Sequence, residues 1–130
     1  MRLLIVDDEY FARQGIMDGV NWDVLQFEEV LQAGSYGEAV ECFERQEEKK
    51  QRIDILLCDI EMPDESGLEL IEWVNGHAPE TECIILSCHD EFDFARQAVR
   101  LKCLDYILKP VRYDFLTEVL AKTMKIAAEK

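Results

Sequence analysis

Asp7 and Asp8, two neighbouring carboxylates, follow directly after the apolar run LLIV at residues 3–6. Adjacent carboxylates raise each other's pKa unless a positive charge lies between them. One interpretation is that the pair caps a helix that begins at Glu9. The other is that the pair binds a cation, and the remaining polar side chains of the chain have to decide between the two.

Polar side chains also end the other apolar runs. Asp59 follows DILLC, Ser87 follows CIIL, and Lys109 follows LDYIL. If these runs are parallel strands, their carboxyl ends meet at one edge of an open α/β sheet, which is the edge where such sheets bind ligands. With the first and third strands as neighbours, the sequence predicts a pocket that contains Asp7, Asp8 and Asp59 and is flanked by Ser87 and Lys109.

Three converging carboxylates require a cation, and oxygen ligands suit Mg²⁺, which keeps several waters and takes one or two protein carboxylates. Asp59 is then available as a nucleophile, since carboxylates form aspartyl-phosphate intermediates. In phosphoryl transfer the protein mainly positions groups and neutralises oxygens. Mg²⁺ would take one phosphoryl oxygen, the Lys109 ammonium a second and the Ser87 hydroxyl a third. The set therefore predicts an acyl phosphate on Asp59.

Short apolar segments that alternate with helical segments have to position these side chains. The pattern predicts an α/β fold of βαβαβαβαβα order, with a doubly wound parallel sheet covered by helices on both faces. Residues 20–22 are expected to be a connection. The expected strands are 2–6, 27–34, 52–58, 82–87 and 103–109, and the expected helices are 9–20, 36–50, 66–76, 91–102 and 113–130.

Composition limits the classes of function. The 130 residues are expected to form one domain. The 14 Lys and Arg residues against 28 Asp and Glu residues give a net charge of −14, which argues against direct nucleic-acid binding by this chain. Neither a signal peptide nor an apolar run of the ~18 residues that a membrane span needs is visible. The five cysteines lack metal-ligand spacing and are expected to be reduced, as in a cytoplasmic protein.

The sequence resembles the response-regulator receiver domains of bacterial two-component signalling. Four stretches carry the resemblance: LLIVDDE, DILLCDIEMPDESGLELI, IILSCHDEFDFARQAV and LDYILKPV. It extends over essentially the whole chain, so residues 1–130 are expected to be one receiver domain. The resemblance implies a flavodoxin-like (βα)5 fold, in which a five-stranded parallel sheet has the strand order 2-1-3-4-5.

The resemblance also assigns roles at the acidic end of the sheet. Asp8 and Asp7 match the acidic metal-binding pair, with Asp8 as the direct ligand, and Asp59 matches the phosphorylated aspartate. Glu61, two positions later, would supply its backbone carbonyl to Mg²⁺. The extra carboxylate of Glu61 is also expected to deter or misplace a water that attacks the phosphoryl group.

Further roles follow at the ends of the last two strands. Ser87 matches the switch serine or threonine, Lys109 the lysine that contacts the phosphoryl group, and Tyr106 the aromatic switch position. In the family this ring turns inward when the hydroxyl moves to the phosphoryl group, and the bond before the proline at the Pro110 position is commonly cis. Cys88, where a smaller residue is common, is expected to influence the dephosphorylation rate.

Two stretches, DEYFARQGI…VNW and SCHDEFDFARQAVRLKCLDYILKPV, are similar to receivers joined to an arabinose-regulator-type (AraC-type) helix-turn-helix DNA-binding domain. This likeness implies a sensor histidine kinase as phosphoryl donor and a transcription-regulating output domain beyond residue 130. It also implies homodimer formation through the face made by residues 91–102, 103–109 and 113–130. The chain is expected to be a signalling switch whose only chemistry is its own phosphorylation and dephosphorylation.

Three alternatives are weighed against this interpretation. A stand-alone receiver would act through protein–protein contacts alone. An aspartate-nucleophile phosphatase of the haloacid dehalogenase type is disfavoured, because there the nucleophile lies on the first strand and the acidic pair comes late. A flavin carrier with the same sheet needs a phosphate-binding loop after the first strand, where the DDEYF segment at residues 7–11 repels phosphate instead.

Overall fold

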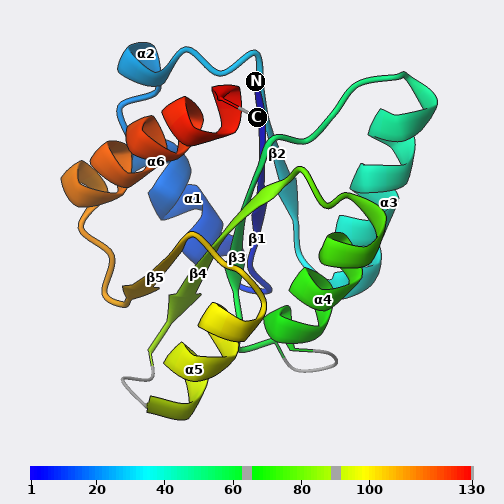
Figure 1. Ribbon diagram of the computed structural model, residues 1–130. Helices are drawn as coiled ribbons and strands as arrows, with labels where there is room; N and C mark the ends of the chain where they lie inside the picture. The colour runs from blue at the N-terminus through cyan, green and yellow to red at the C-terminus, as the bar shows by residue number, and fades with distance from the viewer. Residues whose placement is uncertain (63–65, 89–91, 130) are drawn as a thin grey trace.

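The computed structural model describes residues 1–62, 66–88 and 92–129. Its centre is a single sheet of five parallel strands (Figure 1) in the order β2-β1-β3-β4-β5. The flavodoxin-like strand order implied by the resemblance is therefore confirmed. The strands are β1 (Arg2–Val6), β2 (Glu29–Ala33), β3 (Ile55–Asp59), β4 (Glu82–Ser87) and β5 (Asp105–Leu108).

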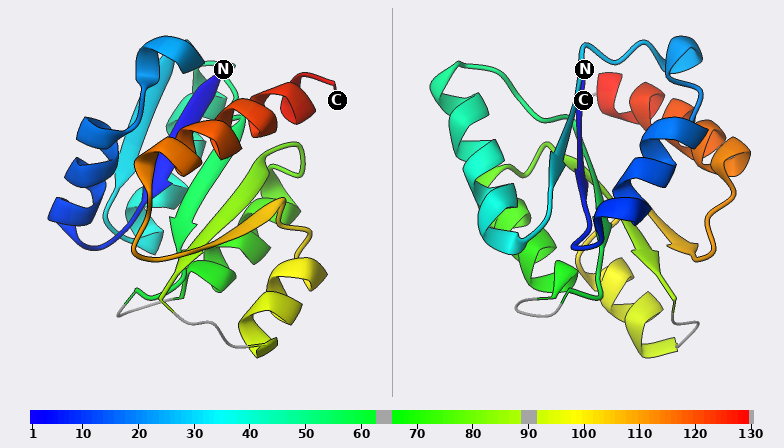
Figure 2. Two further views of the ribbon diagram at one scale, coloured as in Figure 1. Left: turned by 90° about the vertical axis from the view of Figure 1, so that its left-hand side faces the viewer. Right: turned by 180° about the vertical axis from the view of Figure 1, so that it is seen from behind.

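Helices cover both faces of the sheet (Figure 2), with α1 and α6 on one face and α3, α4 and α5 on the other. None of the helices in the described ranges is long and apolar enough to span a membrane. The helices are α1 (Tyr10–Gly19), α2 (Trp22–Leu25), α3 (Tyr36–Glu48), α4 (Gly67–His77), α5 (Phe92–Arg100) and α6 (Tyr113–Ala128).

The alternation of side chains along each strand divides the core in two. In β1, Leu4 and Val6 pack towards α3 and α4, whereas Leu3 and Ile5 pack towards α1 and α6. Because successive side chains of a strand point to opposite faces, a strand covered on both sides must be apolar at every position. This requirement explains the uninterrupted apolar runs, and it pushes polar side chains to the strand ends.

Helix α2 differs from the sequence analysis, which expected only a connection at residues 20–22. The Asn21 side chain caps this four-residue helix by accepting a hydrogen bond from the Val24 N–H. The Trp22 indole N–H donates to the Met17 carbonyl at 2.8 Å and fastens the segment to α1. A helix of four residues is too short to produce a readable hydrophobic period.

Candidate functional site

The carboxylates of Asp7, Asp8 and Asp59 meet at the carboxyl edge of the sheet. One ligand oxygen from each lies within 4.8 Å of the others, since β1 and β3 are paired neighbours. Asp7 and Asp59 are 1% and 3% exposed, whereas Asp8 is exposed to solvent. The predicted convergence of these three side chains is thus observed, and it places an open acidic group beside two buried ones.

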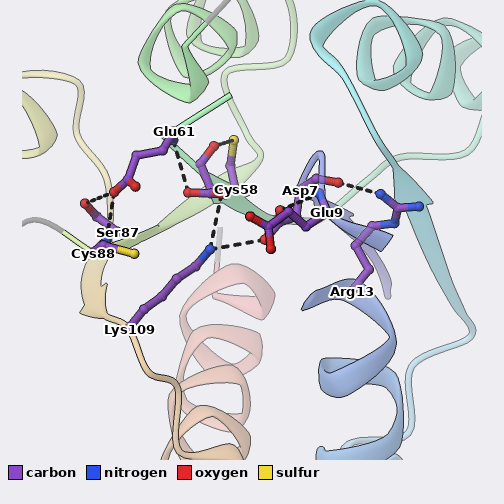
Figure 3. Close-up of polar contacts among 9 residues, drawn as sticks. Asp7, Glu9, Arg13, Cys58, Glu61, Ser87, Cys88 and Lys109 are labelled. Carbon is purple, nitrogen blue, oxygen red and sulfur yellow. Dashed lines mark hydrogen bonds and ion pairs between the residues drawn. The ribbon is translucent and has the colours of Figure 1, made fainter. Parts of the chain in front are cut away.

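Lys109 supplies the positive charge between the two buried carboxylates (Figure 3). Its Nζ atom lies 3.3 Å from Asp7 Oδ2 and 3.2 Å from Asp59 Oδ2. The Lys109 backbone N–H donates to the Ser87 carbonyl at 2.8 Å, and the Lys109–Pro110 peptide bond is cis. The strand-end lysine therefore reaches the acidic residues from β5, across the width of two strands.

The backbone fixes the second oxygen of each buried carboxylate. Asp7 Oδ1 accepts the Glu9 N–H at 2.9 Å, and Asp59 Oδ1 accepts the Glu61 N–H at 3.0 Å. Each carboxylate thus has one oxygen bound to the loop that follows its strand and the other bound to Lys109. This arrangement leaves the orientation of both groups determined before any ligand arrives.

The electrostatics of the site reflect burial and crowding. Burial raises the pKa of Asp59 above its ordinary value, and the charge of Asp7 adds to the increase, against the opposing effects of the Glu61 N–H and Lys109. Burial alone would lower the pKa of Lys109, but the two carboxylates outweigh it and raise the pKa. Lys109 therefore stays protonated, and the site retains an unmet demand for positive charge.

Ser87 lies at the end of β4, completely buried, and its hydroxyl donates to Glu61 Oε1 at 3.0 Å. The backbone N–H of Cys88 donates to the same oxygen at 2.8 Å. The Glu61 side chain consequently bridges the loop after β3 to the end of β4 (Figure 3). The sequence indicated that this carboxylate is near the pocket but did not reveal its two partners.

Tyr106, the residue assigned to the aromatic switch, lies in β5 opposite Ile85. It is partly buried and packs against the core cluster on the α3, α4 and α5 side of the sheet. Its switch role stays a prediction.

Arg13 is a site residue that sequence reasoning missed. Its Nη1 atom donates to the Asp7 carbonyl at 2.5 Å and its Nε atom to Gln32 Oε1 at 3.2 Å. Arg13 thereby holds the loop after β1 against the end of β2. The available signal was its position on the first turns of α1, four residues after Glu9, which turns it back towards the strand ends.

Gly67 lets α4 approach the end of β3 without an intervening side chain. A Cβ atom at this position would clash with the Asp59 carbonyl oxygen and would lie 2.7 Å from Ile60 Cα and 2.8 Å from Cys58 Sγ. Ser66 caps the helix by accepting the Glu69 N–H, a role that serine commonly has at a helix N-terminus. The first turn of α4 therefore rests directly on the backbone that carries Asp59.

The Gly67→Ala variant is expected to lose about 1–3 kcal/mol of unfolding free energy, because a methyl group would press on backbone atoms that cannot rotate away. The measurement is chemical denaturation of both proteins. Gly76→Ala, in the same helix with no atom within 4 Å of the added Cβ, is the matched control and should be neutral or slightly stabilising. Equal effects of the two substitutions would contradict the proposed close approach.

Comparison with known families agrees with this arrangement. A family model described as "Response regulator receiver domain" matches residues 3–121. The chain therefore belongs to the receiver domain family of two-component response regulators, and it is a signalling domain rather than a metabolic enzyme.

Among solved structures, the two-component transcriptional regulator AraC from Clostridium phytofermentans is similar to this chain with a TM-score of 0.87 and 26% identity, covering 99% of this chain and 96% of that chain. The REC domain of AraT, a response regulator from Geobacillus stearothermophilus, is 34% identical with a TM-score of 0.85, covering 98% and 95% of the two chains.

Two curated relatives are longer than this chain. The sensory transduction protein LytT of Enterococcus faecalis is 34% identical over 125 residues, which make up 96% of this chain and 48% of LytT. The transcriptional regulatory protein HptR of Staphylococcus aureus is 26% identical over 129 residues, 99% of this chain and 48% of HptR. The chain spans about half the length of the curated relatives that it matches.

Proposed function

We propose that Asp59 accepts a phosphoryl group from a sensor histidine kinase, in the presence of Mg²⁺, and that the phosphorylated domain passes a conformational change to an output. The observation that carries this proposal is the shared Lys109 ammonium. It contacts Asp59 and Asp7 at once, which supports Asp59 as the acceptor, Lys109 as the cation beside it and Asp7 as a carboxylate of the metal site.

The donor set fits a divalent cation that prefers oxygen. Asp8, Asp7 and Asp59 would hold Mg²⁺ together with the backbone carbonyl of Glu61, and Lys109 alone leaves the three carboxylates with net negative charge. Bound Mg²⁺ would supply charge neutralisation for the incoming phosphoryl oxygens. The exposed Asp8 is the open side of this set, through which a hydrated ion would enter.

The chain's own residues have defined tasks in the transfer. A carboxylate oxygen of Asp59 forms a bond to phosphorus while the bond from phosphorus to the kinase histidine nitrogen breaks. The Lys109 ammonium and the Ser87 hydroxyl then donate hydrogen bonds to phosphoryl oxygens. Ser87 moves towards the phosphoryl group, and Tyr106 turns inward.

The output is proposed to be a transcription-regulating DNA-binding domain beyond residue 130. This proposal rests on two similar proteins: HptR is named a transcriptional regulatory protein, and the Clostridium phytofermentans protein is named a two-component transcriptional regulator. A cytoplasmic location and the absence of direct nucleic-acid contact by this chain belong to the same proposal.

The face formed by α5, β5 and α6 is the proposed partner-binding surface. A second receiver would bind there in a homodimer, and another protein would bind there if the domain acts as a stand-alone receiver. Exposed apolar side chains on these three elements support that face: Val99, Leu108 and Phe115.

The experiment that tests the function is covalent labelling. The protein is incubated with a small acyl-phosphate donor, with Mg²⁺ or with a chelator, and its mass is measured. The expected result is a gain of one phosphoryl group that depends on Mg²⁺. An unmodified protein in the presence of Mg²⁺, or turnover of general phosphomonoesters without a stable adduct, would overturn the proposal.

Removing the exposed carboxylate is expected to weaken metal binding. The Asp8→Ala variant should bind Mg²⁺ more than about tenfold less tightly, a loss above ~1.4 kcal/mol, because a direct ligand and a negative charge disappear together. Isothermal titration calorimetry provides the measurement. Asp23→Ala, an exposed aspartate in α2 at the other end of the molecule, is the control, and equal affinities in the two variants would contradict the metal assignment.

A further inference from the structure

The Glu61 carboxylate already occupies hydrogen-bond donors that a phosphoryl group on Asp59 would need. One oxygen, Oε1, accepts both the Ser87 hydroxyl at 3.0 Å and the Cys88 backbone N–H at 2.8 Å. Both donors lie at the end of β4, and β3, which carries Asp59, separates β4 from β1 and Asp7. An anionic oxygen that accepts two convergent donors is the environment expected for a phosphoryl oxygen.

We propose that the Glu61 carboxylate takes the place of the phosphoryl group in the unphosphorylated protein. It accepts the hydrogen bonds of Ser87 and Cys88, and it has to be displaced for Asp59 to be phosphorylated. This inference rests on the proposed function of Asp59. It goes further by giving the Glu61 side chain a task before phosphorylation, in addition to the expected contributions of its backbone carbonyl to Mg²⁺ binding and of its carboxylate to misplacing an attacking water. Glu61 is a positioning residue, since it acts through Ser87 and Cys88.

The anchoring of Glu61 allows such an exchange. Its backbone N–H donates to Asp59 Oδ1 at 3.0 Å, so the residue is fixed at the acceptor while its side chain extends to β4. Rotation of the side chain would remove Oε1 from the Ser87 hydroxyl and the Cys88 N–H and keep the backbone hydrogen bond. A phosphoryl group carries a charge of about −1.5 to −2, and it would repel the carboxylate from these donors at the same time.

The exchange has a consequence for the switch. In the unphosphorylated protein the Glu61 side chain ties the loop after β3 to the end of β4. Every phosphorylation must first break this tie, so the reactive arrangement has a lower population and the apparent affinity for a phosphoryl ligand falls accordingly. Removal of the carboxylate should therefore make the domain easier to phosphorylate.

The test compares the wild type with Glu61→Ala, Glu61→Gln and the control Glu72→Ala, an exposed glutamate in α4. The probe is beryllium trifluoride with Mg²⁺, a stable mimic of the phosphoryl group, and the readouts are its equilibrium affinity and the initial rate of labelling by an acyl-phosphate donor. Glu61→Ala should raise both by about tenfold, which corresponds to the loss of one charged hydrogen-bond arrangement. Glu61→Gln keeps the acceptor oxygen without the charge and should give a smaller increase, and Glu72→Ala should give none.

Two further readouts separate this role from a merely structural one. The Cys88 amide resonance should change little when the wild type binds beryllium trifluoride, because one anionic acceptor replaces another, but should shift strongly in Glu61→Ala. In a Ser87→Ala background the effect of Glu61→Ala should shrink, as expected for residues that act on one another. Thermal melting of each variant identifies any loss of fold. If Glu61→Ala is unfolded, the comparison of Glu61→Gln with the wild type decides the test.

Unchanged or lower affinity and rate in Glu61→Ala, with the wild type labelled normally, would overturn this inference and leave the proposed function intact. A wild type that is not labelled at all would overturn both.

Discussion

The Asp59→Asn variant is expected to take up no phosphoryl group from a small acyl-phosphate donor, under conditions in which the wild type takes up one. The amide of asparagine has the shape of the carboxylate but is not a nucleophile, so the bond to phosphorus cannot form. Mass spectrometry of the intact protein provides the measurement. Asp23→Asn, which makes the same chemical change at an exposed site in α2, should label like the wild type.

Labelling of Asp59→Asn at the wild-type level would show that another residue is the acceptor. Asp7 is the first residue to examine in that case, because its carboxylate shares Lys109 with Asp59.

The same variant should also be more stable than the wild type at neutral pH without Mg²⁺. Burial, followed by the charge of Asp7, raises the pKa of Asp59. A group whose pKa is higher in the folded state stabilises the fold while it is protonated, and this contribution is lost as the pH rises through the folded-state pKa. The difference in melting temperature should therefore narrow as the pH falls towards about 4. A variant less stable than the wild type at pH 7 would contradict this expectation.

Replacing Lys109 by methionine is expected to slow labelling by about 100-fold, the usual cost of removing one donor to a developing oxyanion. It should also destabilise the protein without Mg²⁺ by about 2 kcal/mol, since Asp7 and Asp59 would keep buried charge without a partner. The lysine side chain is 21% exposed, so the loss of unfolding free energy should stay below the roughly 3–5 kcal/mol that breaking a fully buried ion pair costs. Rates of labelling and chemical denaturation are the two measurements.

Lys109→Arg separates the charge of this residue from its geometry. A guanidinium keeps the positive charge but cannot act as a compact point donor, so this variant should retain more of the stability than of the labelling rate.

Mg²⁺ should raise the melting temperature of Lys109→Met more than that of the wild type, because the acidic cluster has lost its competing cation. An equal increase in both proteins would show that Lys109 and the metal do not share the same carboxylates.

Much of the site could be predicted from the sequence because the sheet itself determines it. Once apolar runs alternate with helices, the ends of parallel strands have only one edge at which to meet. Asp59 and Lys109 are separated by fifty positions in the chain and yet lie in contact, as the strand pattern required. The strand order came from the family resemblance, since the periodicity of the runs alone allows several orders.

The rest of the site depends on loop conformations and side-chain rotamers, which a period does not encode. Nothing in the letters around Glu61 distinguishes a side chain that faces solvent from one that accepts hydrogen bonds from Ser87 and Cys88. Arg13 illustrates the same limit, because its target is a backbone carbonyl rather than an acidic side chain. Contacts between a side chain and the backbone leave no complementary residue type for a sequence pattern to reveal.

At Gly67, α4 rests on the end of β3 with no side chain of its own between them. The eleven residues of this helix extend about 16 Å, and its first residue contacts the main chain of Asp59 and Ile60. Towards the far end of the helix, the Trp73 ring stacks on His77 and meets the edge of Phe43. Because no side chain separates α4 from this main chain, a tilt of a few degrees about the contact would displace the far end of the helix by about 1 Å. The Trp73 ring, which is nearer to the contact, would move less.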